Sequence, residues 1–352
     1  SVGRKDKADG RFLCVLLIVT AASVAPACAD DAVSFAGKTI TIDVASTAGG
    51  GYDFGARAIA RYLPKYLPGA PSVVVRNMPG AGGVVLANHL YNVAPKDGTE
   101  IGAFESDTAF TPTLNGQPVN FEPAKFGWLG SLDKFVPMVL AWHTKPFQRF
   151  DDLKTTKMSV GSTGPGSATS GYPYSLNAFL GTKFDVINGY PGSAEMTLAL
   201  ERGELDGYVG WCWDCLKHEK PQWLTDHSVR VLLQLSFDGD PELTAMGVPT
   251  MRDVAKTDEQ IKMMQIVLAS ASFGRPYAAP PRLPAPVLAA WQKAFEGAAH
   301  DSQLAADMQA AKSQVRFAGP DGIVKLLVDA ASLDAATLDK LRSAYLGKDE
   351  TP

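Results

Sequence analysis

The chain has 352 residues, of which 46% are hydrophobic and 20% are charged, and its formal net charge is −4. This mildly acidic balance, without a cluster of basic residues, argues against binding to nucleic acid or to an anionic lipid surface. A chain of this length exceeds what one hydrophobic core usually serves, so two domains are expected.

The first 29 residues have the pattern of a secretory signal peptide. Four basic residues precede an apolar run at residues 12–22, and Ala27-Cys28-Ala29 places small residues where a signal peptidase cleaves. The apolar run is too short to span a bilayer, which needs about 20 residues. Cys28 offers a lipid anchor as an alternative, although Ala25 stands where such signals usually carry Leu. We therefore expect a signal peptide at residues 1–29 and a protein exported to the periplasm.

A glycine-rich turn follows the first strand pattern. Apolar residues alternate over residues 40–44, and the chain then reads Ser46-Thr47-Ala48-Gly49-Gly50-Gly51-Tyr52-Asp53 before a helix pattern begins. Glycine lets the backbone approach a ligand closely, and the first N–H groups of a helix have no intrahelical partners, so this order is typical of an anion site. The same order recurs at residues 72–75, which lead into Pro79-Gly80-Ala81-Gly82-Gly83. The ligand is therefore expected to be acidic.

Strand and helix patterns alternate through the rest of the chain. Strands are expected at residues 101–104, 136–142, 158–160, 185–187, 205–209 and 229–235, and helices near 174–180, 194–202 and from 286 to the end. The strand at 158–160 leads into a loop rich in Gly, Ser and Thr at residues 161–171. This alternation predicts an α/β fold with parallel or mixed sheets covered on both faces, and a ligand site at the carboxyl ends of the strands.

Several motifs occur in an order known from one family. They are Ala48-Gly49-Gly50-Gly51-x-Asp53, Val75-x-Asn77-x-Pro79-Gly80-Ala81-Gly82-Gly83, Ala94-Pro95-Lys96-Asp97-Gly98-Thr99, Gly189-Tyr190-Pro191-Gly192 and Arg202-Gly203-Glu204-Leu205-Asp206. With them, the chain from about residue 38 to 345 resembles the substrate-binding proteins of tripartite tricarboxylate transporters, the Bug family. The resemblance implies a two-lobe periplasmic-binding-protein (Venus flytrap) architecture, in which each lobe is a mixed sheet flanked by helices.

The resemblance also implies the domain organisation and the partners. Lobe one would comprise residues 30–138 plus 271–352 and lobe two residues 139–270, joined by crossing strands near residues 136–142 and 269–275. The cleft would capture a carboxylate, and the protein would deliver it to the membrane subunits of the transporter. We expect a monomer that is not an enzyme and needs no cofactor or metal.

The family's ligand site carries over to particular positions of this chain. Backbone N–H groups of the first turn would hold one carboxylate, a hydroxyl-rich loop in lobe two would hold a second acidic or polar group, and the segment after residues 101–104 would line the cleft. The candidate ligand-binding residues are Ser46, Gly50, Gly51, Tyr52, Asp53, Ser106, Asp107, Thr108, Ser162, Thr163, Gly164, Ser167, Ala168, Thr169, Tyr190 and Trp211.

Three of these candidates have more than one interpretation. Tyr52 and Trp211 stand where the family often has Thr and a small or polar residue, and two rings facing one cleft would favour an aromatic or longer carboxylate. The alternative is that Trp211 packs beneath the loop and only Tyr52 lines the cleft. Asp53 fits a ligand contact, but an Asp at the start of a helix more often caps it or holds the turn.

The sequence also contains features of other functions. Trp211-Cys212-Trp213-Asp214-Cys215 resembles a thioredoxin active site, so the alternative function is an exported thiol-disulfide oxidoreductase using Cys212 and Cys215. In an oxidising compartment these cysteines are expected to form a structural disulfide. The spacing of Gly49, Gly51 and Gly55 fits a nucleotide-binding turn, but only weakly. The histidines near Cys212 and Cys215 lack the spacing of a common zinc site.

Overall fold

The computed structural model describes residues 2–3, 33–46, 48–49, 51–116, 118–190, 193–311 and 313–348. The described residues from 33 to 348 form one compact unit. The expected signal peptide and Cys28 therefore lie outside the described residues, apart from Val2 and Gly3. Among the described residues, no helix is both long and apolar enough to cross a membrane.

The first of two five-stranded sheets contains the strand that precedes the first glycine turn. Its spatial order is β2-β1-β3-β10-β4, with β1 parallel to both neighbours and β10 antiparallel to β3 and β4. Ile40, Ile42 and Val44 of β1 are fully buried, as the apolar alternation predicts. The strands are β1 Thr39–Val44, β2 Ser72–Asn77, β3 Glu100–Ala103, β4 Gly127–Ser131 and β10 Pro276–Ala279.

The second sheet repeats this arrangement. Its order is β7-β6-β8-β5-β9, with β6 parallel to both neighbours and β5 antiparallel to β8 and β9. Its strands are β5 Pro137–Trp142, β6 Met158–Ser162, β7 Phe184–Asn188, β8 Gly207–Cys212 and β9 Val229–Gln234. The predicted fold class, two mixed sheets flanked by helices, is thus confirmed.

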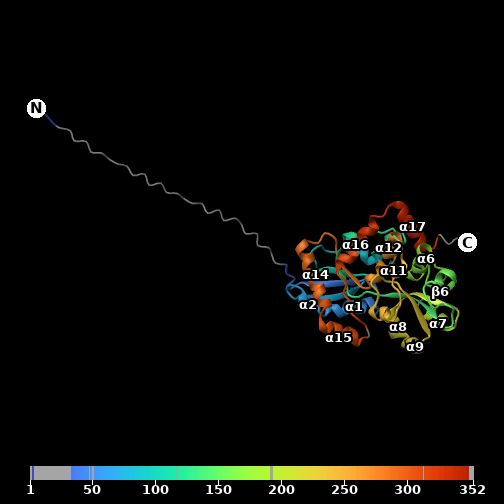
Figure 1. Ribbon diagram of the computed structural model, residues 1–352. Helices are drawn as coiled ribbons and strands as arrows, with labels where there is room; N and C mark the ends of the chain where they lie inside the picture. Colours follow the sequence, from blue (N-terminus) through green and yellow to red (C-terminus); the bar gives the residue numbers. More distant parts are fainter. Residues whose placement is uncertain are drawn as a thin grey trace. The chain divides into compact units, whose positions relative to one another are not determined.

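Helices flank both sheets. In Figure 1, α1, α2, α14 and α15 lie together at one side although they come from distant parts of the chain, and α6, α7, α8 and α9 lie at the other. The α-helices are α1 Gly51–Ala60, α2 Leu63–Tyr66, α3 Val84–Asn92, α4 Thr111–Leu114, α5 Asp152–Thr155, α6 Ala168–Leu180, α7 Ser193–Glu201, α8 Trp213–Glu219, α9 Pro221–Thr225, α10 Pro241–Ala245, α11 Met251–Val254, α12 Asp258–Val267, α13 Ala269–Ser272, α14 Ala285–Ala299, α15 Ser302–Ala310, α16 Pro320–Ala331 and α17 Ala335–Leu346. Two 3-10 turns, η1 Ala81–Gly83 and η2 Pro123–Lys125, precede α3 and β4.

Three segments lie side by side between the two sheets, and two of them connect the sheets. The chain leaves the first sheet over residues 132–136 and returns over residues 273–275, and the N–H of Leu132 donates to the carbonyl of Arg275 at 3.1 Å. The third segment, residues 313–318, lies beside this crossing, since the N–H of Arg316 donates to the carbonyl of Leu132 at 2.9 Å. We expected the first crossing at residues 136–142, but most of that stretch is β5. The chain crosses over residues 132–136 instead.

The last helix differs from the expected lobe division. Helix α17 belongs to residues 271–352, which were expected to lie wholly in lobe one, but it packs against α6 beside the second sheet. The contact is close because Gly171 has no side chain: a Cβ there would lie 2.2 Å from the ring of Tyr345. Arg342 of α17 also donates to the carbonyls of Pro112 and Thr113, at 2.8 and 2.9 Å, on the first-sheet side. Helix α17 thus contacts both halves.

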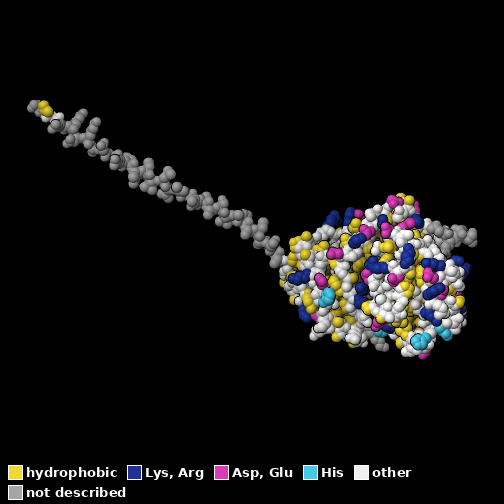
Figure 2. Space-filling model, in the orientation of Figure 1, with side chains coloured by type: hydrophobic (Ala, Val, Ile, Leu, Met, Phe, Trp, Pro, Cys, Tyr) yellow, Lys and Arg dark blue, Asp and Glu magenta, His cyan; other side chains and the backbone are white. Residues whose placement is uncertain are grey.

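The buried apolar residues form three clusters. One lies around the first sheet and includes Ile40, Trp291 and Phe295, a second includes Trp211 and Trp223, and the third contains residues from both halves. On the face shown in Figure 2, acidic and basic side chains are interspersed without a contiguous basic patch.

Candidate functional site

The first glycine turn, residues 46–50 between β1 and α1, is held from outside by side chains. Gly49 adopts φ +87°, a left-handed conformation that favours glycine, and its N–H donates to Asp53 Oδ2 at 2.8 Å. Asn77 Nδ2 donates both to Asp53 Oδ1 at 2.8 Å and to the carbonyl of Ser46 at 3.0 Å. The predicted residue Gly50 lies outside the described residues.

Asp53 is therefore a residue that holds the turn. Its carboxylate is 3% exposed and also accepts from Arg57 Nε at 3.0 Å. The hydrogen bonds from Arg57, with those from Gly49 and Asn77, lower the pKa of Asp53 from 3.8 to about 2. Of the two interpretations, the structure favours the structural one, because these donors already occupy both carboxylate oxygens.

The second glycine motif leads from β2 to α3, as the recurring order predicted, and it also supports the first turn. Its Asn77 reaches Asp53 and Ser46, and its Gly83 packs against Thr108, where a Cβ would lie 2.3 Å from Thr108 Oγ1. Thr108 is fully buried and donates to the carbonyl of Gly82 at 3.0 Å. Thr108, a predicted cleft residue, is thus a packing residue beneath this motif.

Tyr52 links the start of α1 to the segment after β3. Its hydroxyl accepts from the N–H of Ser106 at 3.0 Å and donates to Ser106 Oγ at 3.3 Å. Burial raises the pKa of the Tyr52 hydroxyl, and burial also raises the pKa of the neighbouring Glu105 and Asp107 carboxyls. The structure therefore brings three predicted residues, Tyr52, Ser106 and Asp107, to one place.

The predicted hydroxyl-rich loop, residues 162–169 and named here the serine-threonine loop, is folded onto itself. Ser162 Oγ accepts from the N–H of Gly164 at 3.0 Å, and Thr169 Oγ1 accepts from the N–H of Thr163 at 3.1 Å. Ser167 Oγ donates to the carbonyl of Gly164 at 2.8 Å. The hydroxyls thus fix the loop, at whose end Ala168 begins α6. Ser170, which the sequence reasoning missed, donates to the same Gly164 carbonyl at 2.8 Å.

Trp211 does not form the aromatic pair with Tyr52 that one interpretation expected. The Trp211 side chain is 5% exposed, stacks on Tyr208 with ring centroids 5.5 Å apart, and meets Trp223 edge-on at 5.7 Å. Because these neighbours bury the Trp211 ring, Trp211 belongs to the hydrophobic core. Tyr190 packs partly against the same cluster, and its N–H donates to the carbonyl of Ser162 at 3.1 Å.

The predicted pairing of Cys212 with Cys215 is present as a disulfide, with the two Cα atoms 5.1 Å apart. Cys212 Sγ accepts from the N–H of Cys215 at 3.1 Å at the start of α8. Thr250, which a thioredoxin fold would place before a strand, instead begins α11 through a capping box with Asp253. Because the two thiols are joined, they also offer no pair of zinc ligands in this state.

A cavity of about 400 Å³ lies between the first turn and the disulfide. One wall is the start of α1, with Gly51 and Phe54, and the opposite wall is α8 with the disulfide. The segments between the sheets supply further lining residues, among them Asp133, Phe135, Arg275, Ser313 and Gln314. The cavity thus contains predicted residues Gly51, Cys212 and Cys215, whereas its described lining includes none from the serine-threonine loop.

Arg275 and Asp133 form an ion pair in this cavity that sequence reasoning missed. Arg275 Nη1 lies 3.2 Å from Asp133 Oδ2, and the two side chains are 14% and 11% exposed. Burial raises the pKa of Asp133 to about 6, against the opposing effect of Arg275. The two residues are far apart in the sequence, so no spacing rule could pair them. A single Arg at the end of an expected crossing strand was the one available signal.

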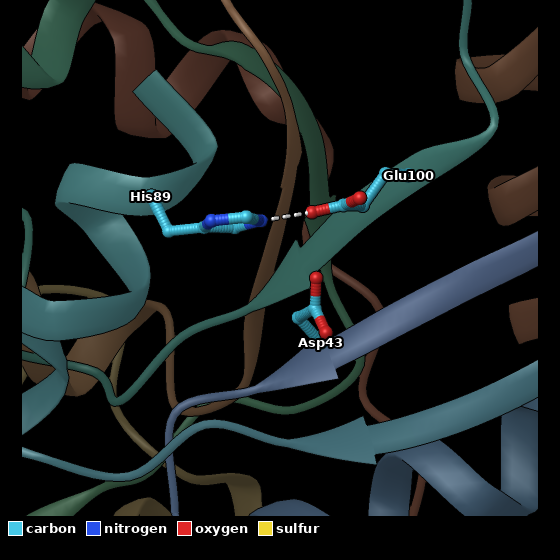
Figure 3. Close-up of side chains that lie close together, drawn as sticks. All are labelled: Asp43, His89 and Glu100. Carbon is cyan, nitrogen blue, oxygen red and sulfur yellow. Dashed lines mark hydrogen bonds and ion pairs between the residues drawn. The ribbon is translucent and has the colours of Figure 1, made fainter. Parts of the chain in front are cut away.

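A second cluster of titratable side chains lies across the first sheet. Figure 3 shows His89 of α3 pointing at Glu100 of β3, with Asp43 of β1 beside it, and their ligand-type atoms lie within 4.8 Å of one another. Arg76 of β2 contacts both carboxylates, with Nη2 2.9 Å from Asp43 and 3.5 Å from Glu100. Because Arg76 and His89 already pair with both carboxylates, we interpret the cluster as an ion network that joins three strands and a helix.

Comparison with known proteins gives one curated relative. No protein-family model matches the chain. The chain is similar to a UPF0065 protein encoded in the TAR-I ttuE-ttuC' intergenic region of Agrobacterium vitis, with 29% identity over 210 residues. The alignment covers 56% of this chain and 57% of that protein, so the chain matches little more than half of the relative's length.

Solved structures share the fold over nearly their whole length. A TctC solute-binding protein from Polaromonas, without ligand, aligns with a TM-score of 0.70 at 18% identity, over 87% of this chain and 98% of that one. MatC from Rhodopseudomonas palustris, with bound malate, aligns with a TM-score of 0.55 at 20% identity, over 87% and 98%. Another R. palustris protein, with adipate, aligns with a TM-score of 0.57 at 17% identity, over 87% and 97%. The chain therefore has the fold of the TctC and Bug solute-binding proteins, which is the fold that the resemblance of its motifs implied.

Proposed function

We propose that this protein is a periplasmic solute-binding protein that captures an organic acid and delivers it to the membrane subunits of a tripartite tricarboxylate transporter. The fold that it shares with MatC, which holds malate, and with the adipate-bound R. palustris protein supports this proposal. In our proposal the protein acts as a monomer, without a cofactor, and it makes and breaks no covalent bond with its ligand. The Cys212–Cys215 disulfide is then structural.

The observation that carries the proposal is the glycine turn that leads into α1. The N–H of Gly49 donates to Asp53, which ties this described residue of the turn to α1. Gly51 lines the cavity as the first residue of α1, where N–H groups have no intrahelical acceptor and the helix dipole favours negative charge. A carboxylate there would accept charge-assisted hydrogen bonds.

We propose that a second acidic or polar group of the ligand meets the serine-threonine loop. The start of α6 at Ala168 provides N–H groups of the same kind as the start of α1. The two halves would close on the ligand by small rotations about the three segments between the sheets, residues 132–136, 273–275 and 313–318. In that arrangement Tyr52, Ser106 and Asp107 would line one side of the cleft.

A thermal-shift screen tests the proposed function. The panel consists of malate, adipate, citrate, glutamate, benzoate and phthalate, each added to the protein without its first 29 residues. An acid present at about 100 times its Kd should stabilise the fold by about 2.7 kcal/mol and raise the melting temperature by several degrees. No shift from any acid would contradict carboxylate capture.

Two substitutions at one position test where the acid binds. A Cβ at Gly51 would have 3.7 Å to its nearest neighbour, Arg275 Nη2, so Gly51→Ala fits without a clash. Gly51→Asp adds a negative charge at the proposed seat, and we expect it to abolish the shift that the best acid produces. Gly51→Ala is the matched control and should retain most of that shift. Equal binding by both variants would contradict this placement.

A further inference from the structure

Arg275 is the most distinctive residue of the cavity beside the first turn. Of the described residues that line this cavity, Arg275 is the only lysine or arginine, and its side chain is 14% exposed. The described lining also contains Phe54, Phe135, the disulfide and His218, together with the three carboxylates of Asp133, Asp214 and Glu219. A cation in so enclosed a place needs negatively charged or polar partners.

The guanidinium of Arg275 is only partly paired. Nη1 donates to Asp133 Oδ2 at 3.2 Å and to Ser313 Oγ at 3.5 Å. Nη2 lies 3.7 Å from the point where a Cβ of Gly51 would be, and no described residue accepts a hydrogen bond from it. An arginine has five N–H donors, so one end of this one is available to a molecule in the cavity.

The fold fixes Arg275 in this position. Its backbone N–H donates to Ser131 Oγ at 2.9 Å, which ties it to the end of β4. Its side chain passes beneath α1 at Gly55, where a Cβ would lie 3.0 Å from Arg275 Cδ. A side chain at Gly55 would crowd this path, so the glycine gives the arginine access to the first turn.

We propose that Arg275 is a ligand-binding residue whose guanidinium pairs with the carboxylate seated at the first turn, with Asp133 as its counter-ion. This inference rests on the proposed function and adds a charged side chain to a site otherwise built from backbone N–H groups. The planar guanidinium matches a carboxylate in geometry, and its Nη2 faces the turn from which the N–H groups of α1 start. The ligand is then bound from two sides.

Asp133 has a defined role in this arrangement. It balances the charge of Arg275 while the cavity holds no acid, and it competes with the ligand for the same guanidinium. Removing its charge should therefore strengthen acid binding, whereas removing Arg275 should weaken it. If the ion pair were purely structural, the two substitutions would not change acid affinity in opposite directions, and their effects would not depend on the charge of the ligand.

Calorimetric titrations of three variants test the inference, with adipate and benzoate as probes and their amides, adipamide and benzamide, as uncharged counterparts. Arg275→Gln should weaken binding of the acids by about 10- to 100-fold, the usual range for one charge-assisted hydrogen bond, and leave binding of the amides nearly unchanged. Asp133→Asn should strengthen acid binding by several-fold. Arg275→Gln leaves the buried Asp133 carboxylate without its cation. The double variant Arg275→Gln with Asp133→Asn has no such unpaired carboxylate, and it should also bind the acids weakly.

Arg252→Gln is the control. Arg252 of α11 pairs with Asp238 at 3.3 Å, and neither residue is among those that line this cavity. Its affinity for the acids should equal that of the wild type. Unchanged acid affinity in Arg275→Gln, together with loss of binding in Gly51→Asp, would overturn the role of Arg275 and leave the proposed function standing. No binding of either acid by the wild type would overturn the carboxylate assignment of this cavity, and the wider panel then decides the proposed function.

Discussion

The first turn and the serine-threonine loop occupy equivalent places in two sheets of the same order, yet they are fixed in different ways. The first turn is held by side chains outside it, Asp53 and Asn77, which leave glycine backbone at the cavity. The serine-threonine loop is held by its own hydroxyls, which bond to its own backbone. The same sheet topology thus presents glycine backbone to the cavity in one half, and in the other half a loop whose hydroxyls bond to its own backbone.

The largest expected effect comes from removing the outside support of the first turn. Asp53→Ala would leave the N–H of Gly49, Asn77 and Arg57 without their shared acceptor. We expect a loss of about 3 kcal/mol in the free energy of unfolding, together with weaker acid binding, because the turn loses its fixed conformation. Urea unfolding and titration with adipate measure the two effects. Ser170→Ala removes a hydroxyl of α6 that donates to the loop carbonyl of Gly164, and it should cost about 1 kcal/mol or less. An equal loss in both variants would contradict the comparison.

A second substitution tests the packing of α17 against α6, which lies beside the second sheet. Gly171→Ala places a methyl group 2.2 Å from the ring of Tyr345, so α17 must move away. We expect a loss of about 2 kcal/mol in stability, the usual scale of overpacking. Gly319→Ala is the control, since nothing lies within 4 Å of a Cβ at that position and its backbone is extended. Thermal unfolding of both variants measures the difference.

The pH dependence of stability distinguishes the carboxylate of Asp53 at the first turn from that of Asp133 in the cavity. Asp53 has a pKa of about 2, below its ordinary 3.8, so its contribution is present above about pH 4 and is lost as the pH falls through 2. Asp133 has a pKa of about 6, above its ordinary value, so the folded state holds its proton longer and stability falls as the pH rises from 4 to 6. Asp133→Asn should remove that fall, of roughly 1 to 2 kcal/mol, in urea unfolding at pH 4, 5, 6 and 7. An unchanged slope would contradict the raised pKa.

The smallest expected effect concerns the wall of the cavity opposite the first turn. Cys212 and Cys215 close a very short loop, so a variant with both cysteines changed to Ser should lose only roughly 1 kcal/mol in stability. Under the proposed function this variant keeps its affinity for the best acid of the panel. A free-thiol titration and an insulin-reduction assay of the wild type complete the test, and catalytic reduction of insulin would favour the oxidoreductase alternative.

Much of the fold could be predicted because it depends on local patterns. The alternation of Ile40, Ile42 and Val44 indicates β1, and the glycines after it indicate the turn and the start of α1. Trp211 shows the limit of such reasoning. It lies on β8, beyond the expected strand at residues 205–209, and its contacts with Tyr208 and Trp223 decided which way its side chain faces. A strand pattern does not reveal which of its faces an aromatic partner will cover.

Local patterns in the amino-acid sequence were enough to predict most strands, though not β4 and β10, as well as the glycine turn and the closeness of Cys212 to Cys215, because these depend on residues near one another in the chain. Only the tertiary structure decided that Asn77 supports the first turn, that α17 packs against α6, and that Arg275 meets Asp133 beneath Gly51. Each of these contacts joins residues distant in sequence, and its geometry depends on how the two sheets are packed. The charge in the cavity is therefore a property of the assembled fold.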